Sequence, residues 1–190
     1  MTSDFLSFVR DNRRLLGAWF VAMMIVVVPV AFFPHSGDLT TFLRVATAMD
    51  EGKILYRDIV DIKPPLVYDV VRAYNYLGGG SEFWIHCVDA LVLLGVLFIA
   101  SFLLYRVIGD AAIALTSTWF MAVLYVSTGY TTVIQSESLA ILPFIVLIRL
   151  QLDEHKTGSW YKGILTGVVG AVLTGLKITL GSVLLVIAIV

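Results

Sequence analysis

The stretch LLGAWFVAMMIVVVPVAFF, Leu15–Phe33, contains no ionisable side chain, and Arg10, Arg13 and Arg14 come just before it. A helix crosses the ~30 Å hydrocarbon core of a bilayer with roughly 20 apolar residues. A secretory signal peptide is the alternative interpretation, but its apolar region is usually about 7–15 residues long, and the PHSGD that follows does not resemble a cleavage site. The stretch therefore predicts an uncleaved helix that anchors the chain in a membrane.

The composition of the whole chain agrees with a membrane environment. Of 190 residues, 59% are hydrophobic and 14% are charged, whereas soluble domains average roughly 45–50% apolar and about 25% charged residues. The formal net charge of −1 argues against a nucleic-acid partner, which would favour a clustered basic surface. The single cysteine, Cys87, excludes an internal disulfide and a cysteine-based metal site. We therefore expect an all-α polytopic membrane protein surrounded by membrane lipids.

Further apolar segments follow the first one. Phe83–Tyr105 and Ala111–Tyr130 are expected to be the second and third spans, and Leu139–Leu150 a shorter fourth. A fifth segment begins at Gly163, meets Lys177 and continues as an apolar run to the end of the sequence. Residues 15–190 are thus expected to hold about five to six spans. Because no polar flank follows the last run, we expect this region to be the N-terminal part of a larger transmembrane domain whose C-terminal remainder is missing.

The basic residues of the connecting segments predict the orientation of these spans. The arginines before the first span, Arg106 after the second, and Lys156 and Lys162 between the fourth and fifth all fall on one side if the spans alternate. That side is expected to be the cytoplasm, so residues 1–14 form a cytoplasmic N-terminus. The long first loop, residues 34–82, then lies outside. The predicted location is a multi-pass protein of the cytoplasmic membrane.

The first loop contains two amphipathic patterns. Asp38 is a candidate N-cap for a helix that Gly52 ends, with an apolar face made of Leu39, Phe42, Leu43, Ala46 and Met49. Pro64 and Pro65 suit the first turn of another helix, and the glycines at 78–80 end it. We expect both helices to lie along the outer bilayer surface. Their polar faces are then expected to frame a site at the lipid–water boundary.

The same loop carries a distinctive motif. Residues 52–66 have the sequence GKILYRDIVDIKPPL, and the acidic Asp38 lies just after the first span. Together these features resemble the membrane glycosyltransferases of the GT-C fold, closest to the bacterial and archaeal branch related to dolichyl-phosphate-mannose–protein mannosyltransferases, which includes lipopolysaccharide-core and aminoarabinose transferases. Two weaker similarities are QSES with Glu137, and a glycine-rich helix that ends in Lys177. The resemblance runs from Asp38 to Lys177 and implies a GT-C-like transmembrane helix bundle.

The resemblance also implies a reaction and its two main residues. The expected activity is inverting transfer of a sugar from a polyprenyl-phosphate donor to a hydroxyl of a lipid, glycan or protein acceptor, on the extracytoplasmic face. Such a reaction needs a base for the acceptor proton and cations for the departing phosphate. Asp38 is the candidate base, with helix capping as the structural alternative. Lys63, just before a helix start, is the candidate phosphate ligand, with a snorkelling surface lysine as its alternative.

The motif supplies four further candidates for substrate binding. Arg57 is expected to add to phosphate binding. Asp58 and Asp61 are expected to orient the side chains of Arg57 and Lys63 or to bind sugar hydroxyls. For these three residues the alternative is a local ion-pair cluster in a polar loop. Tyr56 either stacks on the sugar or anchors the loop at the membrane interface.

Two more candidates lie outside the first loop. Glu137 is a candidate second catalytic acid that faces Asp38, and the alternative is an acid stabilised by the dipole of a helix first turn. Lys177 stands between two apolar runs, which favours a functional role in binding the donor. Snorkelling from a short span is the alternative for this lysine.

Cofactors and competing functions complete the predictions. The sequence has no H-x₃₋₅-H or carboxylate cluster typical of a metal site, so no metal ligand is assigned, no cofactor is expected to be required, and a divalent cation enters only as an accessory. A transporter or flippase of a lipid-linked sugar and a non-catalytic membrane assembly subunit are the alternative functions. The nearly all-apolar inner halves of the spans count against a translocation path. Because the chain matches only the N-terminal half of such enzymes, an inactive fragment is also compatible with the sequence.

Overall fold

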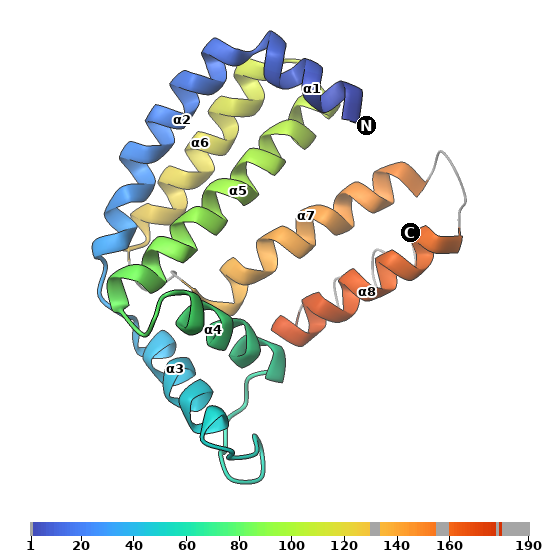
Figure 1. The fold of residues 1–190 in the computed structure, drawn as a ribbon. Helices are drawn as coiled ribbons and strands as arrows, with labels where there is room; N and C mark the ends of the chain where they lie inside the picture. The colour runs from blue at the N-terminus through green and yellow to red at the C-terminus, as the bar shows by residue number, and fades with distance from the viewer. Residues whose placement is uncertain (1, 130–133, 155–159, 178, 180–190) are drawn as a thin grey trace. The chain divides into compact units, whose positions relative to one another are not determined.

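The computed structural model describes residues 2–129, 134–154, 160–177 and 179, and these residues are mostly helical with no β-strand among them. Figure 1 shows the helices in chain order. Their bounds are α1 Thr2–Asp11, α2 Arg13–Val27, the 3₁₀ helix η1 Val28–Phe32, α3 Gly37–Asp50, α4 Pro65–Leu77, α5 Glu82–Ile108, α6 Ala111–Ser127, α7 Ser136–Glu154 and α8 Trp160–Leu176. The all-α class expected from the sequence is confirmed for the described residues.

The chain forms two compact units. Unit 1 contains α1, α2, η1, α5 and α6, and unit 2 contains α3, α4, α7 and α8. Each unit therefore combines segments from both halves of the sequence. The first-loop helices predicted from capping and periodicity are α3 and α4 of unit 2.

Unit 1 is held together by an apolar core that contains a cluster of three hydrogen-bonded polar side chains. α2 and α5 both pack against α6, and their core includes Met23 and Leu97. Inside it, the indole Nε1 of Trp19 donates to the Thr118 hydroxyl at 3.2 Å, and the Ser101 and Thr118 hydroxyls lie 2.6 Å apart. Hydrogen bonds of this kind between apolar helices add a directional interaction to the packing of their side chains.

The α5–α6 connection is short because its residues suit both helix ends. Gly109 takes the left-handed conformation with φ 80°, which ends α5. Asp110 then caps α6 by accepting a hydrogen bond on Oδ1 from the Ile113 amide at 3.0 Å. The boundary between the second and third predicted spans is thus determined locally.

Unit 2 contains two helix pairs. α3 packs against α4, and α7 packs against α8. In the first pair, the rings of Phe42 and Tyr68 meet edge to face with centroids 5.9 Å apart. In the second pair, Leu147, Leu173 and Leu176 are buried, and Leu66 of α4 packs against this cluster. α4 therefore connects the two pairs.

The lengths and apolar character of the described helices test part of the predicted set of membrane spans. Arg13–Phe32 and Glu82–Ile108 are long and apolar enough to cross a membrane, whereas Ala111–Ser127, Ser138–Leu150 and Trp160–Leu176 are shorter apolar helices. The described residues of the five predicted spans are mostly helical, and α8 ends directly before Lys177. The apolar run predicted after this lysine lies outside the described residues, apart from position 179.

The structure refines three details of the sequence interpretation. Residues 1–14 were expected to be a cytoplasmic N-terminus, and most of them form a helix that was not predicted, α1, with Phe8 buried in the unit 1 core. On α3 the buried face includes Val45, which was not predicted, whereas the predicted Leu43 and Met49 are only partly buried. On α4 the last residue, Leu77, is 66% exposed. Neighbouring helices select which side of each amphipathic pattern becomes buried.

Candidate functional site

The first turn of α3 carries the candidate base. Ser36, not Asp38, is the N-cap of this helix, because its hydroxyl accepts a hydrogen bond from the Leu39 amide at 3.1 Å. The proposal that Asp38 caps α3 is therefore wrong. Asp38 lies in the first helical turn and its side chain is exposed. Its carboxylate is stabilised there by the helix dipole and faces solvent.

The start of α7 lies beside the start of α3. The Gln135 side-chain amide donates to the Ser36 hydroxyl at 3.2 Å, across 99 residues of sequence. Glu137 follows Gln135 by two residues, and Asp38 follows Ser36 by two. The two backbone segments that carry the predicted acids are thus in contact, whereas the side chain of Glu137 lies outside the described part of the structure.

The loop between α3 and α4 is stabilised by its own hydrogen bonds. Tyr56 adopts a positive φ of 67°, which is uncommon for a residue with a side chain, and its amide donates to the Ile59 carbonyl at 2.8 Å. The Tyr56 hydroxyl donates to the Lys63 carbonyl at 2.5 Å. Burial, followed by the charge of Asp61, raises the pKa of Tyr56. Tyr56 therefore positions the backbone of Lys63.

Arg57 and Asp58 form an ion pair within this loop. The Arg57 Nε donates to Asp58 Oδ1 at 2.9 Å and its Nη2 to Oδ2 at 2.7 Å. Asp58 also accepts a hydrogen bond from the Ile54 amide at 2.8 Å. The hydrogen bonds from Arg57 and then from Ile54 lower the pKa of Asp58, and the Asp58 hydrogen bond raises the pKa of Arg57. This arrangement corresponds to the local ion-pair alternative for these two residues.

Asp61 organises the approach to α4. Its Oδ1 accepts hydrogen bonds from the amides of Ile62 at 2.6 Å and Lys63 at 3.2 Å. The nearby Tyr68 hydroxyl is buried and makes no hydrogen bond of standard geometry in the described structure. Burial and then the neighbouring Asp61 carboxylate raise the pKa of Tyr68. Asp61 therefore fixes the backbone at Lys63 and supplies a negative charge beside a neutral phenol.

The side chain of Lys63 returns from this loop to α3. Its Nζ lies 5.7 Å from the centroid of the Phe42 ring, within the range of a cation–π contact. Lys63 is half-buried and makes no ion pair with any described carboxylate. Asp38 is four residues before Phe42 on the same helix, or about 6 Å along its axis. Lys63, the candidate phosphate ligand, thus contacts the turn of α3 that follows the turn carrying Asp38, the candidate base.

The end of α8 meets the start of α4. A Cβ built on Gly175 would lie 3.2 Å from Leu66 Cδ2 and 3.3 Å from Leu66 Cβ, so the two backbones approach closely. Lys63 precedes Leu66 by three residues and Lys177 follows Gly175 by two, which are at most about 10 Å and 7 Å of chain. Two lysines distant in sequence therefore lie in the same part of unit 2.

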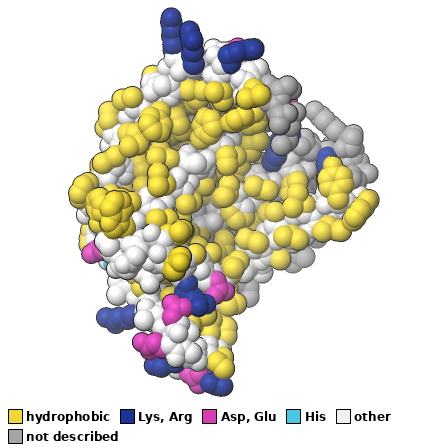
Figure 2. All heavy atoms as spheres, viewed as in Figure 1, with side chains coloured by type: hydrophobic (Ala, Val, Ile, Leu, Met, Phe, Trp, Pro, Cys, Tyr) yellow, Lys and Arg dark blue, Asp and Glu magenta, His cyan; other side chains and the backbone are white. Residues whose placement is uncertain are grey.

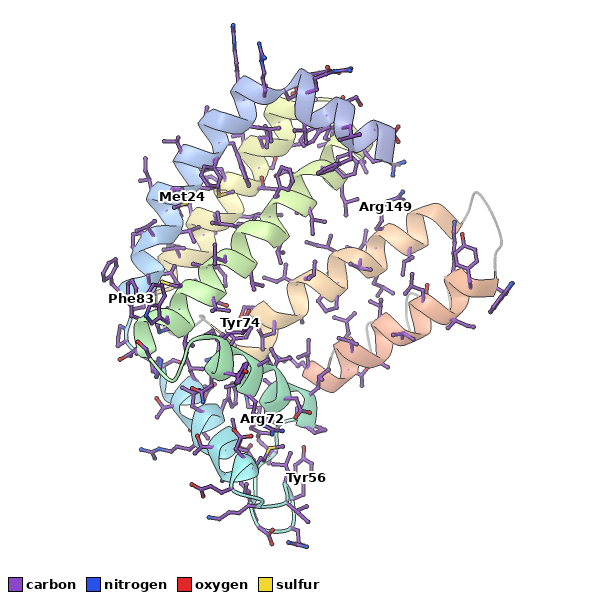
Figure 3. All side chains as sticks on the ribbon, viewed as in Figure 1. Met24, Tyr56, Arg72, Tyr74, Phe83 and Arg149 are labelled. Carbon is purple, nitrogen blue, oxygen red and sulfur yellow. The ribbon has the colours of Figure 1, made fainter. Side chains whose placement is uncertain are left out.

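Three side chains of this region were not among the predicted site residues. Arg72 of α4 donates from Nε to Asp50 of α3 at 2.8 Å and forms a 3.4 Å pair with Asp69; its pKa is raised, chiefly by Asp50. Figure 3 shows Arg72 and Tyr56 near the α3–α4 loop. Phe42 and Tyr68 are the other two. The four-residue spacing of Asp38 and Phe42 was a sequence signal for Phe42. No local sequence signal distinguished Tyr68.

Comparisons of the chain with protein-family models, with curated proteins and with solved structures found no match. Function is therefore inferred from the motif of residues 52–66 and from the geometry of unit 2.

Proposed function

We propose that this chain is the donor-binding part of a membrane glycosyltransferase that uses a polyprenyl-phosphate sugar. In this reaction Asp38 accepts the proton of an acceptor hydroxyl while that oxygen attacks the anomeric carbon. The bond from this carbon to the donor phosphate oxygen breaks with inversion. The electron pair stays on the phosphate, which leaves as polyprenyl phosphate.

The observation that carries the proposal is the contact of Leu66 with Gly175, because Lys63 and Lys177 lie within three residues of these two positions. Breaking the donor bond converts a singly charged phosphodiester into a phosphomonoester with greater negative charge, and cations aimed at this charge lower the barrier. The Leu66–Gly175 contact brings the two lysine-bearing segments together, and Lys63 makes no ion pair with a described carboxylate. The helix start adds partial positive charge.

Asp38 is suited to the base role by its surroundings. Its carboxylate is exposed and free of the capping function, which Ser36 performs. It stands one turn before Phe42, whose ring contacts Lys63. A general base contributes typically 10²–10⁴-fold to a proton-transfer step, which is large enough to detect.

The other motif residues have supporting roles in this proposal. Asp61 and Tyr56 hold the backbone that presents Lys63, through the hydrogen bonds to its amide and carbonyl. Arg57 pairs with Asp58, which also accepts a hydrogen bond from the Ile54 amide and so stabilises the loop. Glu137 stays a candidate second acid, the accessory divalent cation stays a prediction, and so does the location of the site on the extracytoplasmic face.

The proposal is tested by sugar transfer in membranes that contain the chain and labelled polyprenyl-phosphate sugars. We expect Asp38→Asn to lower the transfer rate at least about 100-fold, and Lys63→Gln or Lys177→Gln to raise the donor KM. Glu51→Gln and Lys53→Gln are matched controls, because they remove exposed charges from the same loop region. Full activity in Asp38→Asn and in both lysine variants would refute the assignment. Transport of the donor without bond cleavage would favour a flippase instead.

A further inference from the structure

A groove runs along unit 1 between the N-terminal parts of α2 and α6. Its volume is ≈ 260 Å³, and small side chains open it: Ala18 and Ala22 on α2 and Ala112 on α6. Trp119 forms part of its wall. From Leu15 to Ala22 the α2 side of the groove is about 10 Å long. The groove is therefore elongated, apolar and open to the surroundings of the helices.

The open end of this groove carries unpaired positive charge. Arg13 and Arg14 are exposed and form no ion pair among the described residues, whereas Arg10 is paired with Asp11 at 2.9 Å. Arg14 precedes Ala18 by four residues and therefore lies on the same line of α2 as the groove. Figure 2 shows basic side chains at this end of the molecule, above a largely hydrophobic face.

An acidic side chain lies at the start of the opposite wall. Asp110 caps α6, and its Oδ1 accepts the Ile113 amide hydrogen bond. The first turn of α2 lacks such a cap, since the Asn12 side chain makes no capping hydrogen bond and donates instead to the Phe8 carbonyl. An anion at this rim therefore finds its favourable partners on the α2 side.

We propose that the groove binds an anionic phospholipid of the leaflet on the α2 N-terminal side. The lipid phosphate pairs with Arg14, assisted by Arg13, and the upper part of one acyl chain lies over Ala18 and Ala22. A zwitterionic lipid supplies the same apolar chain but carries a choline charge that opposes the arginines. Basic sites between transmembrane helices recognise anionic headgroups through this difference. The site shares no residue with the proposed sugar-transfer site and does not depend on that proposal.

Native mass spectrometry of the purified full chain tests the site, with phosphatidylglycerol and phosphatidylcholine of identical acyl chains added at equal concentration. We expect bound phosphatidylglycerol to exceed phosphatidylcholine at least about fivefold, and Arg14→Gln to lower its occupancy about fivefold. Ala18→Leu, which fills the groove, is expected to displace the lipid. Arg10→Gln and Val21→Leu are matched controls, because Arg10 is paired and Val21 is exposed but does not line the groove.

Three results would overturn the inference. Equal binding of the two lipids would mean that the arginines do not select the headgroup. Unchanged phosphatidylglycerol binding in both Arg14→Gln and Ala18→Leu would mean that the lipid binds elsewhere. A dimer that Ala18→Leu dissociates would mean that a second copy of the chain occupies the groove. Arg14 is exposed, so its variant keeps the unit 1 core, and circular dichroism of the purified variants checks this directly.

Discussion

The ammonium group of Lys63 lies 5.7 Å from the centre of the Phe42 ring. This contact joins the loop after α3 to the buried face of α3 itself. It also ties the orientation of a candidate phosphate ligand to a side chain that is only 1% exposed. The position of Lys63 is therefore controlled by the packing of unit 2 as well as by its own loop.

A double-mutant cycle measures this contact. We expect Phe42→Leu and Lys63→Gln to show a coupling free energy of about 0.5–1 kcal/mol in unfolding, because the double variant loses the cation–π contact only once. Chemical denaturation in detergent gives the four free energies. Strict additivity of the two substitutions would show that the ring does not hold the ammonium group.

The close approach of Leu66 and Gly175 makes a second prediction. Gly175→Leu inserts a side chain where Leu66 already lies within 3.2 Å of the Cβ position, so we expect a loss of about 1–3 kcal/mol of stability. Gly167→Leu is the control on the same helix, because no atom lies within 4 Å of its Cβ position. Thermal unfolding compares the two. In the transfer assay Gly175→Leu is also expected to raise the donor KM, since it separates α4 from α8.

Removal of the hydroxyl group is predicted to change the stability of the protein differently at the two tyrosines near Asp61. Tyr56→Phe loses the hydrogen bond to the Lys63 carbonyl and is expected to cost about 0.5–1.5 kcal/mol. Tyr68→Phe removes a buried hydroxyl without a standard hydrogen bond, so stability is expected to stay the same or rise. Denaturation of both variants under identical conditions checks the contrast. A large loss in Tyr68→Phe would reveal a strong bond to Asp61.

Tyr68 also predicts a change in stability at high pH. Its pKa is raised in the folded protein, so the phenol favours folding below the unfolded pKa of about 10. As pH rises above that value, the unfolded chain loses the proton first and stability falls. Tyr68→Phe is expected to remove this part of the slope. Unfolding free energies between neutral pH and strongly alkaline pH give the measurement.

At low pH the Asp58 carboxylate predicts loosening of the α3–α4 loop. The pKa of Asp58 is lowered in the folded protein, so its contribution is present above the unfolded carboxyl pKa of about 4 and is lost as pH falls through the lower folded value. The Ile54 amide, which donates to Asp58, is expected to exchange faster there after correction for the intrinsic rate. Hydrogen exchange measured by mass spectrometry follows this amide. In Asp58→Asn the exchange is expected to be fast already at neutral pH.

Much of the fold followed from local sequence signals. Pro64, Pro65 and the glycines after Leu77 gave the bounds of α4, and long apolar runs gave α2 and α5. The cap of α3 did not follow, because Ser36 and Asp38 are both preferred capping residues and the choice depends on which residue leaves the helical conformation first. Helix α1 was missed because its pattern is short and partly polar, and Phe8 is buried only when unit 1 forms.

The sequence by itself determined most of the helices and the concentration of charge in residues 52–66, since periodicity, capping and loop chemistry act over a few residues. Only the tertiary structure decided that Gln135 meets Ser36 and that Gly175 meets Leu66. It also decided that Arg57 is committed to Asp58 while Lys63 is not paired with a described carboxylate. The physical reason is that contacts between distant segments depend on how buried side chains fit together. A missing Cβ at Gly175 permits an approach that no local pattern encodes.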